Sequence, residues 1–198
     1  MNKLYSTACE RNRDPILQIL RGVLANAGRV LEIGSGTGQH AVYFGAALPH
    51  LSWQTSDLPQ NHPSIQAWIA EAGLSNVLPP IALDTAAGPW PQQSFDAVFT
   101  ANTCHIMAWD EVVAMFAGIA RVLRPGGAVC IYGPFNYGGR FTSDSNARFD
   151  ASLRERAAHM GLRDFEAMDA LARGHGLELA ADHAMPANNR LLVWIKTA

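Results

Sequence analysis

The feature that most constrains the fold is a short apolar segment that runs into a turn of alternating glycines. Residues 30–33 read Val-Leu-Glu-Ile, and Gly34, Gly36 and Gly38 follow at every second position. Residues 39–48 then have the composition of a helix. A strand, a tight glycine turn and a helix N-terminus in this order are typical of doubly wound α/β sheets, which bind ligands beside that turn. The segment therefore predicts an α/β protein with a ligand site just after residue 33.

The spacing of the glycines argues against a dinucleotide site. Such sites use Gly-x-Gly-x-x-Gly, which would place the third glycine at position 39, where this chain has Gln39. A pyrophosphate is favoured by the positive end of a helix and disfavoured by a nearby carboxylate. Glu32 lies just before the turn. We therefore rank a dinucleotide-dependent oxidoreductase last among the candidate functions.

Three carboxylates follow apolar segments that we expect to form strands: Glu32, Asp57 and Asp84. Ligands of open α/β sheets bind at the carboxyl ends of the strands, so we expect these acids at one edge. The separation of Asp57 from Gly38 is close to the ~20 residues typical of an acid that binds a ribose. The alternative is a glycine turn in an unrelated α/β protein, with exposed acids at its strand ends.

The glycines at positions 34, 36 and 38 resemble motif I of class I methyltransferases, which bind S-adenosylmethionine. This cofactor carries a sulfonium, an ammonium and a ribose diol and has no phosphate, so nearby carboxylates suit it. The resemblance implies an α/β, Rossmann-like fold. Its sheet would have seven strands, mostly parallel with an antiparallel last strand, and helices on both faces.

Composition bounds the class of protein. The chain has 198 residues, the length of one domain, and 48% apolar residues, which indicates a globular fold. A formal charge of −2 without a basic run argues against DNA as a partner, because non-specific binding needs a cationic surface. Three cysteines without a Cys-x-x-Cys pair and the lack of a long apolar run lead us to expect a soluble, cytoplasmic protein without a membrane partner.

Strand and helix patterns alternate along the chain. We expect a single domain over residues 1–198, with an N-terminal helical cover at about 5–27 whose helix starts at Asp14-Pro15, and a polar, glycine-rich insertion at about 133–154. Because proline cannot complete a strand ladder, Pro79-Pro80 predicts a third strand that is short or at an edge. The expected strands are residues 29–33, 51–56, 77–83, 95–101, 128–132, 177–184 and 191–196, the last two forming an antiparallel hairpin. The other expected helices are residues 37–48, 64–72, 109–123 and 164–173.

A closer resemblance rests on longer segments. Residues 133–142 read Gly-Pro-Phe-Asn-Tyr-Gly-Gly-Arg-Phe-Thr, and together with residues 10–17, 145–154 and 185–189 they resemble a small, uncharacterised methyltransferase-like group. This group, found in bacteria and animals, includes methyltransferase-like protein twenty-six. The resemblance runs from about residue 5 to 196 and implies S-adenosylmethionine as cofactor, with S-adenosylhomocysteine as product. The chain departs from the group after its fourth strand, where Thr103-Cys104 replaces two bulky apolar residues.

The resemblance also implies cofactor-binding residues at the strand ends. Asp57 is expected to bind the ribose hydroxyls, Glu32 to lie beneath the methionine ammonium, and Asp84 to bind the adenine amino group. An ordinary loop acid at Asp84 and a turn cap at Asn102 are the alternatives. The rest of the set lies beside these acids or in an N-terminal segment that folds over the cofactor: Arg11, Asn12, Gly34, Ser35, Gly36, Gly38, Leu58, Thr85, Ala101 and Asn102.

His105, Arg140 and Tyr137 are the candidate catalytic residues. His105 follows the fourth strand, and a histidine acts as a base near neutral pH; packing beside Trp109 is the alternative. Arg140 suits an anionic acceptor and Tyr137 an aromatic wall, whereas the alternative is an insertion that packs on itself with Arg140 paired to Asp144 or Asp150. The sequence predicts neither a metal site nor a hydrolase, since ligand spacings and a Gly-x-Ser-x-Gly turn are lacking.

The leading functional hypothesis is an S-adenosylmethionine-dependent methyltransferase that transfers the methyl group in line to a small molecule, because the chain has no basic run for a nucleic acid. A methyltransferase acting on a protein side chain or RNA is the second hypothesis. A non-catalytic cofactor-binding protein is the third.

Overall fold

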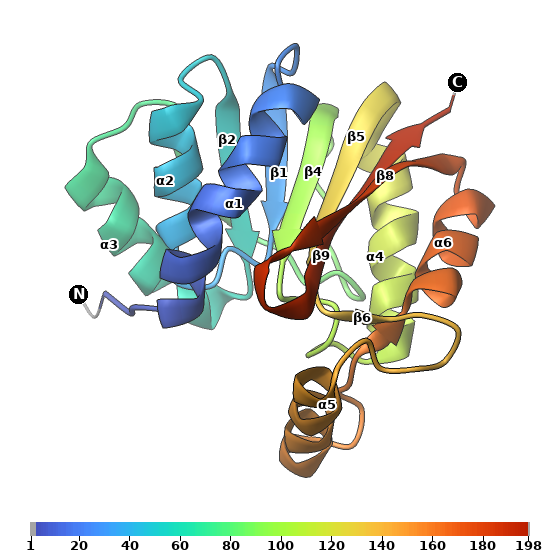
Figure 1. Ribbon diagram of the computed structural model, residues 1–198. Coiled ribbons are helices and arrows are strands. Elements are labelled where there is room, and N and C mark those ends of the chain that lie inside the picture. The colour runs from blue at the N-terminus through green and yellow to red at the C-terminus, as the bar shows by residue number, and fades with distance from the viewer. Residues whose placement is uncertain (1–2, 198) are drawn as a thin grey trace.

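The computed structural model describes residues 3–197 and contains a seven-stranded sheet with the order β3-β2-β1-β4-β5-β9-β8 (Figure 1). Neighbouring strands are parallel except at β5–β9 and β8–β9, which are antiparallel. This confirms the expected fold class, including the edge position of β3 and the late antiparallel hairpin. The strands are β1 Arg29–Ile33, β2 Ser52–Asp57, β3 Val77–Ala82, β4 Phe95–Ala101, β5 Leu123–Gly133, β8 Leu177–Met185 and β9 Asn189–Lys196.

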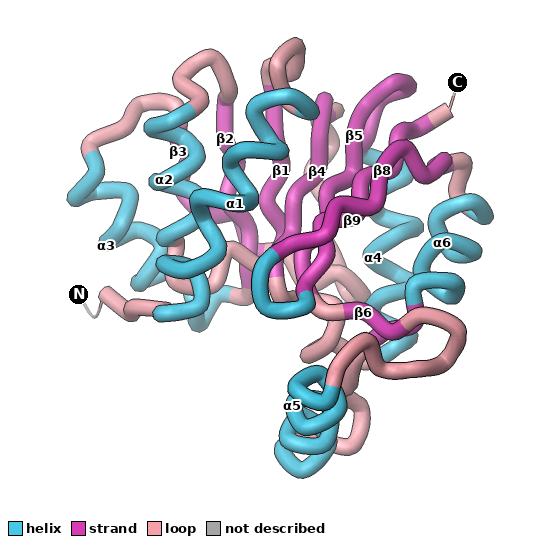
Figure 2. The backbone as a smooth tube through the Cα atoms, in the orientation of Figure 1, coloured by secondary structure: helices cyan, strands magenta, loops and turns pink. Residues whose placement is uncertain are grey.

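Helices cover both faces of the sheet (Figure 2). The first three lie on one face and α4 and α6 on the other. Their bounds are α1 Thr7–Val23, α2 Gln39–Ala47, α3 His62–Ala72, α4 Trp109–Val122, α5 Asp144–Arg156 and α6 Phe165–Gly174, with 3-10 turns at Pro59–Asn61 and Pro186–Asn188. Among residues 3–197, no helix has both the length and the apolarity needed to cross a bilayer.

Two apolar cores lie between the helices and the sheet. On one face Phe44 of α2 packs against Trp53 and Phe99 of β2 and β4, with ring centroids 5.6 and 5.5 Å away. On the other face Phe116 of α4 packs edge-on against Trp194 of β9. The central strands are buried on both faces, which is why their sequences are apolar almost throughout. The two cores hold the strand ends rigidly in register at the edge where ligands of such sheets bind.

The first helix begins at Thr7, so the expected start at Asp14-Pro15 was wrong. Ser6 caps the helix through its side chain, and Pro15 lies inside it. Proline within a helix removes one backbone hydrogen bond. The polar first turns still stay helical because the Asn12 side chain is anchored to His40 of α2, with 2.7 Å between Oδ1 and Nε2.

The insertion after β5 holds more regular structure than its glycines indicate. It contains the short strand β6 Phe135–Asn136 and helix α5, and β6 pairs with β7 Arg163–Asp164. The α5 helix was not expected. It begins where Ser143 accepts a hydrogen bond from the Asn146 backbone N–H at 3.1 Å. In Figure 1, α5 projects beyond the sheet edge at which β1, β2 and β4 end.

Candidate active site

The glycine turn between β1 and α2 has a backbone that only glycine adopts readily. Gly34, Gly36 and Gly38 have φ angles of 69°, 58° and 95°, in the left-handed region where a Cβ is strained. A Cβ on Gly38 would also lie 2.9 Å from the Cα of Ile65. The glycines therefore let the turn pass closely by Ile65 of α3 and Thr103 of the loop after β4.

Asp57 at the end of β2 is tied directly to this turn. Its Oδ2 accepts the Gly36 N–H at 2.7 Å, and its Oδ1 accepts the Leu58 N–H at 2.7 Å and the Asn61 side-chain amide at 2.8 Å. A carboxylate has about four lone-pair positions, so three such bonds leave one free. The structure thus fixes the orientation of Asp57 beside the glycine turn and keeps it 8% exposed. Leu58, the next residue, is 38% exposed.

Glu32 lies buried beneath the turn. Its Oε2 accepts hydrogen bonds from Ser35 Oγ at 2.8 Å and from Trp53 Nε1 at 3.2 Å. Burial raises the pKa of Glu32 to about 7, although the two hydrogen bonds act in the opposite direction. Glu32 is therefore an acid that titrates near neutral pH, directly below the residues that form the turn.

Asp84 lies in the loop after β3 and is partly exposed. Its Oδ1 accepts the backbone N–H groups of Ala86 and Ala87 at 2.9 and 3.1 Å, which is the geometry of an acid that shapes its own loop. The Leu83 N–H donates to the Asp57 backbone oxygen at 3.1 Å. This hydrogen bond holds the start of the loop against the end of β2, so Asp84 and Thr85 lie at the same edge of the sheet as Asp57.

The end of β4 adds a turn in an uncommon conformation. Asn102 has a φ of 59°, which asparagine adopts more readily than other residues with a Cβ. The next residue, Thr103, accepts a hydrogen bond from Thr100 Oγ1 at 2.7 Å, and a Cβ on Gly34 would lie 3.0 Å from its Oγ1. Ala101, the last residue of β4, and Asn102 after it therefore lie right beside the glycine turn.

His105 is buried a few residues further on, with its ring edge-on to Phe149 of α5 at 5.2 Å. Burial, together with the charges of Arg163 and Arg156, lowers the pKa of His105 to about 4. The imidazole is therefore neutral at physiological pH. The Gly161 N–H donates to the His105 backbone oxygen at 2.9 Å, so the segment after α5 covers this residue.

The N-terminal residues lie along the starts of α2 and α3. The Ser6 N–H donates to Gln39 Oε1, and the Leu4 N–H donates to Ser64 Oγ at 3.0 Å. Asn12 is buried against His40, as described above, whereas the Arg11 side chain is exposed. The segment is thus held next to the glycine turn, and Arg11 lies on the surface of the first helix.

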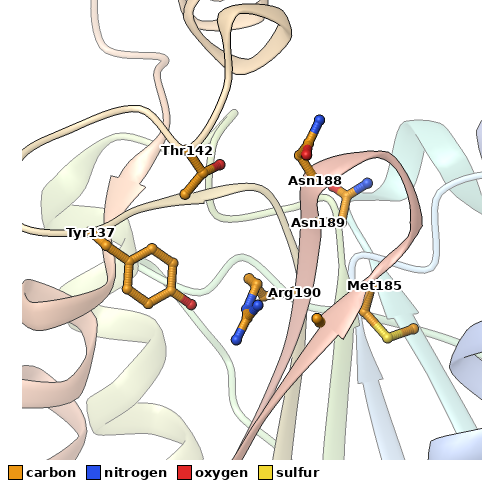
Figure 3. Close-up of a pocket in the computed structure, with 7 residues that line it drawn as sticks. Tyr137, Thr142, Met185, Asn188, Asn189 and Arg190 are labelled. Carbon is orange, nitrogen blue, oxygen red and sulfur yellow. The ribbon is translucent and has the colours of Figure 1, made fainter.

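A cavity of about 380 Å³ opens between the insertion and the turn that joins β8 to β9 (Figure 3). Its lining residues are Tyr137, Thr142, Ala184, Met185, Asn188, Asn189 and Arg190. Asp182 joins two of them, since it accepts the Tyr137 hydroxyl at Oδ2 (2.8 Å) and the Arg190 Nε–H at Oδ1 (2.6 Å). Burial raises the pKa of Tyr137, and the hydrogen bond to Asp182 raises it further. The Tyr137 hydroxyl therefore stays protonated and donates its hydrogen to Asp182.

The structure does not bring all three candidate catalytic residues together. Arg140 is exposed, contacts Tyr137 through backbone hydrogen bonds, and does not line the cavity. Among the described residues no ion pair joins Arg140 to Asp144 or to Asp150, as the alternative expected, and Asp150 is instead bound by Arg154 at 2.6 Å. Among residues 3–197, no three His, Cys, Asp or Glu side chains form a group that could hold a metal.

Sequence reasoning missed the residues that organise the cavity. Asp182 and Arg190 come from paired strands, and their meeting depends on the β8–β9 register, which the sequence does not reveal. Asn146 on α5 was missed with its helix, although Ser143 ahead of it is a usual capping residue. The Oδ1 of Asn136, next to Tyr137, is buried and makes no hydrogen bond within the described residues. No sequence signal marks that oxygen.

Several solved structures with this fold are described as methyltransferases. An O-methyltransferase family protein from Burkholderia thailandensis is 21% identical, with a TM-score of 0.85 over 96% of this chain and 58% of that one. The apo form of the S-adenosylmethionine-dependent methyltransferase SibL is 21% identical, with a TM-score of 0.81 over 96% of this chain and 56% of that one. An O-methyltransferase family 2 protein from Planctomyces limnophilus, in complex with apigenin, is 16% identical, with a TM-score of 0.76 over 93% of this chain and 62% of that one.

These similarities establish the Rossmann-like methyltransferase fold, and the chain spans little more than half the length of the structures it matches. At the level of sequence, the profile of a family described as "Protein of unknown function (DUF938)" matches residues 3–196. The chain therefore belongs to the DUF938 family.

Proposed function

We propose that this protein is an S-adenosylmethionine-dependent methyltransferase that methylates a small molecule by direct in-line transfer. The observation that carries the proposal is the hydrogen bond from the Gly36 N–H to Asp57 Oδ2. It places an oriented carboxylate beside a glycine turn at the carboxyl end of a parallel sheet, where such folds bind a nucleoside. The resemblance to the group that includes methyltransferase-like protein twenty-six supports the same reading.

The chemistry of the residues present fits this cofactor. Asp57 keeps a lone-pair position for a ribose hydroxyl, and a second would become free if the Asn61 amide turned away. The Asp57 carboxylate borders the turn, and the Glu32 acid, whose pKa is raised to about 7 by burial, lies beneath it. Acidic groups at this place suit a cation and disfavour a pyrophosphate. We assign the remaining predicted contacts, at Ser35, Leu58, Asp84, Thr85, Ala101, Asn102, Arg11 and Asn12, to the same site as part of the proposal.

When bound, S-adenosylmethionine supplies an activated methyl group on a sulfonium. The task left to the chain is to hold an acceptor in line and to exclude water, and correct placement alone contributes much of such a rate. His105 is neutral at physiological pH, so one of its two ring nitrogens is able to accept a hydrogen bond from the methyl acceptor. With a pKa of about 4 it is a weak base, which assigns it a role in orientation rather than in full proton removal.

The experiment that tests the proposal follows a labelled methyl group. Purified protein and methyl-labelled S-adenosylmethionine are incubated with a cell extract, which is then separated into small-molecule, protein and RNA fractions. We expect label in the small-molecule fraction, and its loss with Asp57→Ala but not with Asp110→Ala, an exposed control in the first turn of α4.

Each other outcome points to a different function. Label in protein or RNA replaces the small-molecule acceptor with a macromolecule. No label in any fraction, from folded protein that binds S-adenosylhomocysteine, favours a non-catalytic cofactor-binding protein.

A further inference from the structure

The cavity between the insertion and the β8–β9 turn has the size of a small-molecule site. Its volume of about 380 Å³ falls in the range of roughly 300–1,000 Å³ that is usual for such sites. It is lined from two directions, by residues of the insertion and by residues of the last hairpin (Figure 3). A ligand there would therefore touch segments far apart in sequence.

The charge of the cavity is balanced. Arg190 is the single charged residue among those that line it. Asp182 already neutralises Arg190, because Nε donates to Oδ1 at 2.6 Å and Nη2 donates to the Asp182 backbone oxygen at 3.2 Å. A carboxylate ligand would have to compete with Asp182 for the guanidinium and would lie close to its negative charge. The balance therefore favours a ligand without net charge.

The walls of the cavity suit a flat, apolar group. The Tyr137 ring is held by stacking on Phe165 at 5.1 Å, with 19° between the ring planes. The Arg190 guanidinium also lies over the Tyr137 ring, 5.6 Å from its centroid, and in Figure 3 Met185 lies on the other side of Arg190. A planar guanidinium stacks on aromatic faces and a thioether makes favourable contacts with aromatic rings, so Arg190 and Met185 favour an aromatic ligand.

Polar groups at the rim are held in place by α5. The Asn146 amide donates to Thr142 Oγ1 at 2.9 Å and to the Asn188 backbone oxygen at 3.2 Å, and the Asn188 amide donates to Ser145 Oγ at 3.2 Å. These bonds join the insertion to the hairpin turn, so the cavity is formed before a ligand arrives. Amide and hydroxyl groups at such a rim suit a ligand with hydroxyl or carbonyl groups.

The cavity also opens at the edge of the sheet that carries the proposed cofactor site. Arg190 pairs with Gly133 of β5, and Tyr132 pairs with Ala101 of β4. Two strand spacings of about 4.8 Å place Arg190 roughly 10 Å from the end of β4. That distance is within the reach of a molecule of one or two rings.

We propose that this cavity is the acceptor subsite and that it takes an uncharged, aromatic small molecule carrying hydroxyl or carbonyl groups. The Asp182–Arg190 pair sets the preference for an uncharged ligand. The proposal rests on the proposed methyltransferase function for its role as acceptor site, whereas its choice of ligand is measurable without any activity.

The test uses matched probes that differ in charge alone. Binding of 4-hydroxybenzamide and 4-hydroxybenzoate, and of 2-naphthamide and 2-naphthoate, is measured by saturation-transfer NMR and titration with the full chain. We expect at least one amide to bind about tenfold more tightly than its carboxylate. Asp182→Asn keeps the shape of the side chain but leaves Arg190 uncompensated, and it should reverse that preference. Circular dichroism and thermal unfolding verify that the variant is folded.

A second variant keeps the proposal falsifiable if Asp182→Asn fails to fold. Met185→Trp should fill the cavity and abolish amide binding, whereas Val113→Trp, on the exposed side of α4, should leave it unchanged. Equal or tighter binding of both carboxylates by the wild type, no binding of either amide, or retained binding in Met185→Trp would each overturn the proposal. Binding of S-adenosylhomocysteine is measured separately, so loss of the cofactor site alone counts against the proposed function and not against the ligand preference.

Discussion

At the scale of single residues, Glu32 shows how a site can carry a cost in stability. Its pKa is raised from 4.5 in the unfolded chain to about 7 in the folded protein, mainly by burial. As the pH rises from 4.5 through 7, the unfolded chain loses this proton before the folded protein does. Ionisation therefore favours unfolding over that range, and the stability lost above it is on the order of 3 kcal/mol.

We predict that Glu32→Gln stabilises the protein at about pH 8 and much less at about pH 4, because the amide never ionises. The Gln oxygen can still accept the bonds from Ser35 and Trp53. Urea unfolding of both proteins at the two pH values measures the effect. An equal change in unfolding free energy at both would show that ionisation of Glu32 is not its cause.

The glycine turn and the acids at the strand ends were accessible from sequence because their spacing is local. The stability lost when Glu32 ionises was not accessible from sequence, because it depends on the burial of Glu32 beside Ser35 and Trp53. The same is true of His105: the sequence offered it as a base near neutral pH, whereas its surroundings lower its pKa to about 4. Residue type predicts what a group is able to do, and packing decides at which pH.

At the scale of elements, Arg163 in β7 fastens the segment after α5 to the loop after β4. Its guanidinium donates to the backbone oxygens of Cys104 at 3.0 Å, His159 at 3.1 Å, and Met107. Each hydrogen bond to a charged group is worth about 1.5–3 kcal/mol. These bonds hold the loop that carries His105.

We predict that Arg163→Met lowers the free energy of unfolding by about 2–4 kcal/mol, less than the sum of the three bonds because water reaches this half-buried site and replaces part of them. The substitution should also speed hydrogen exchange in residues 104–107 and 157–163. Arg148→Met, which changes an exposed arginine of α5, is the control and should have little effect. An increase in exchange rate over the wild type that is the same throughout the protein, with no larger increase in these two segments, would contradict this role.

Elements with a strong apolar pattern were predicted well from sequence, as β1, β4 and α4 show, whereas β5 begins at Leu123, before the expected start at residue 128. The two helices that were misjudged have weak patterns and rely on long-range contacts. The start of α1 is polar and is held by Asn12 against His40. The α5 helix buries only a few residues, Asn146, Asp150 and Leu153, in the described structure. Its signals were the Ser143 cap and the Asp150–Arg154 pair one turn apart, both of which are weak when read alone.

At the scale of the whole molecule, three buried titratable groups set an optimum of stability. The pKa values of His40 and His105 are both lowered to about 4, mainly by burial. Below their unfolded value of 6.5 the unfolded chain takes up protons that the folded protein does not, so stability falls as the pH falls from 6.5 to 4. Protonation of Glu32 raises the stability as the pH falls, but the two histidines together outweigh this one group.

We therefore predict a stability maximum near pH 6.5, with a net fall below it and a shallower fall above it that Glu32→Gln removes. Thermal unfolding measured in steps from about pH 4 to 9 tests this. A maximum below about pH 5 would contradict the assignment of both histidines as buried and neutral.

The most direct test of the central claim is a calorimetric titration of S-adenosylhomocysteine into the wild type, Asp57→Ala and Asp110→Ala. The structure predicts binding at micromolar concentration by the wild type and by Asp110→Ala. It predicts at least about tenfold weaker binding by Asp57→Ala. Among residues 3–197, Asp57 is the only carboxylate that accepts a hydrogen bond from a backbone N–H of the glycine turn, and this substitution removes it. Folded wild-type protein that fails to bind, or equal binding by all three proteins, would contradict the claim that this turn and Asp57 form a cofactor site.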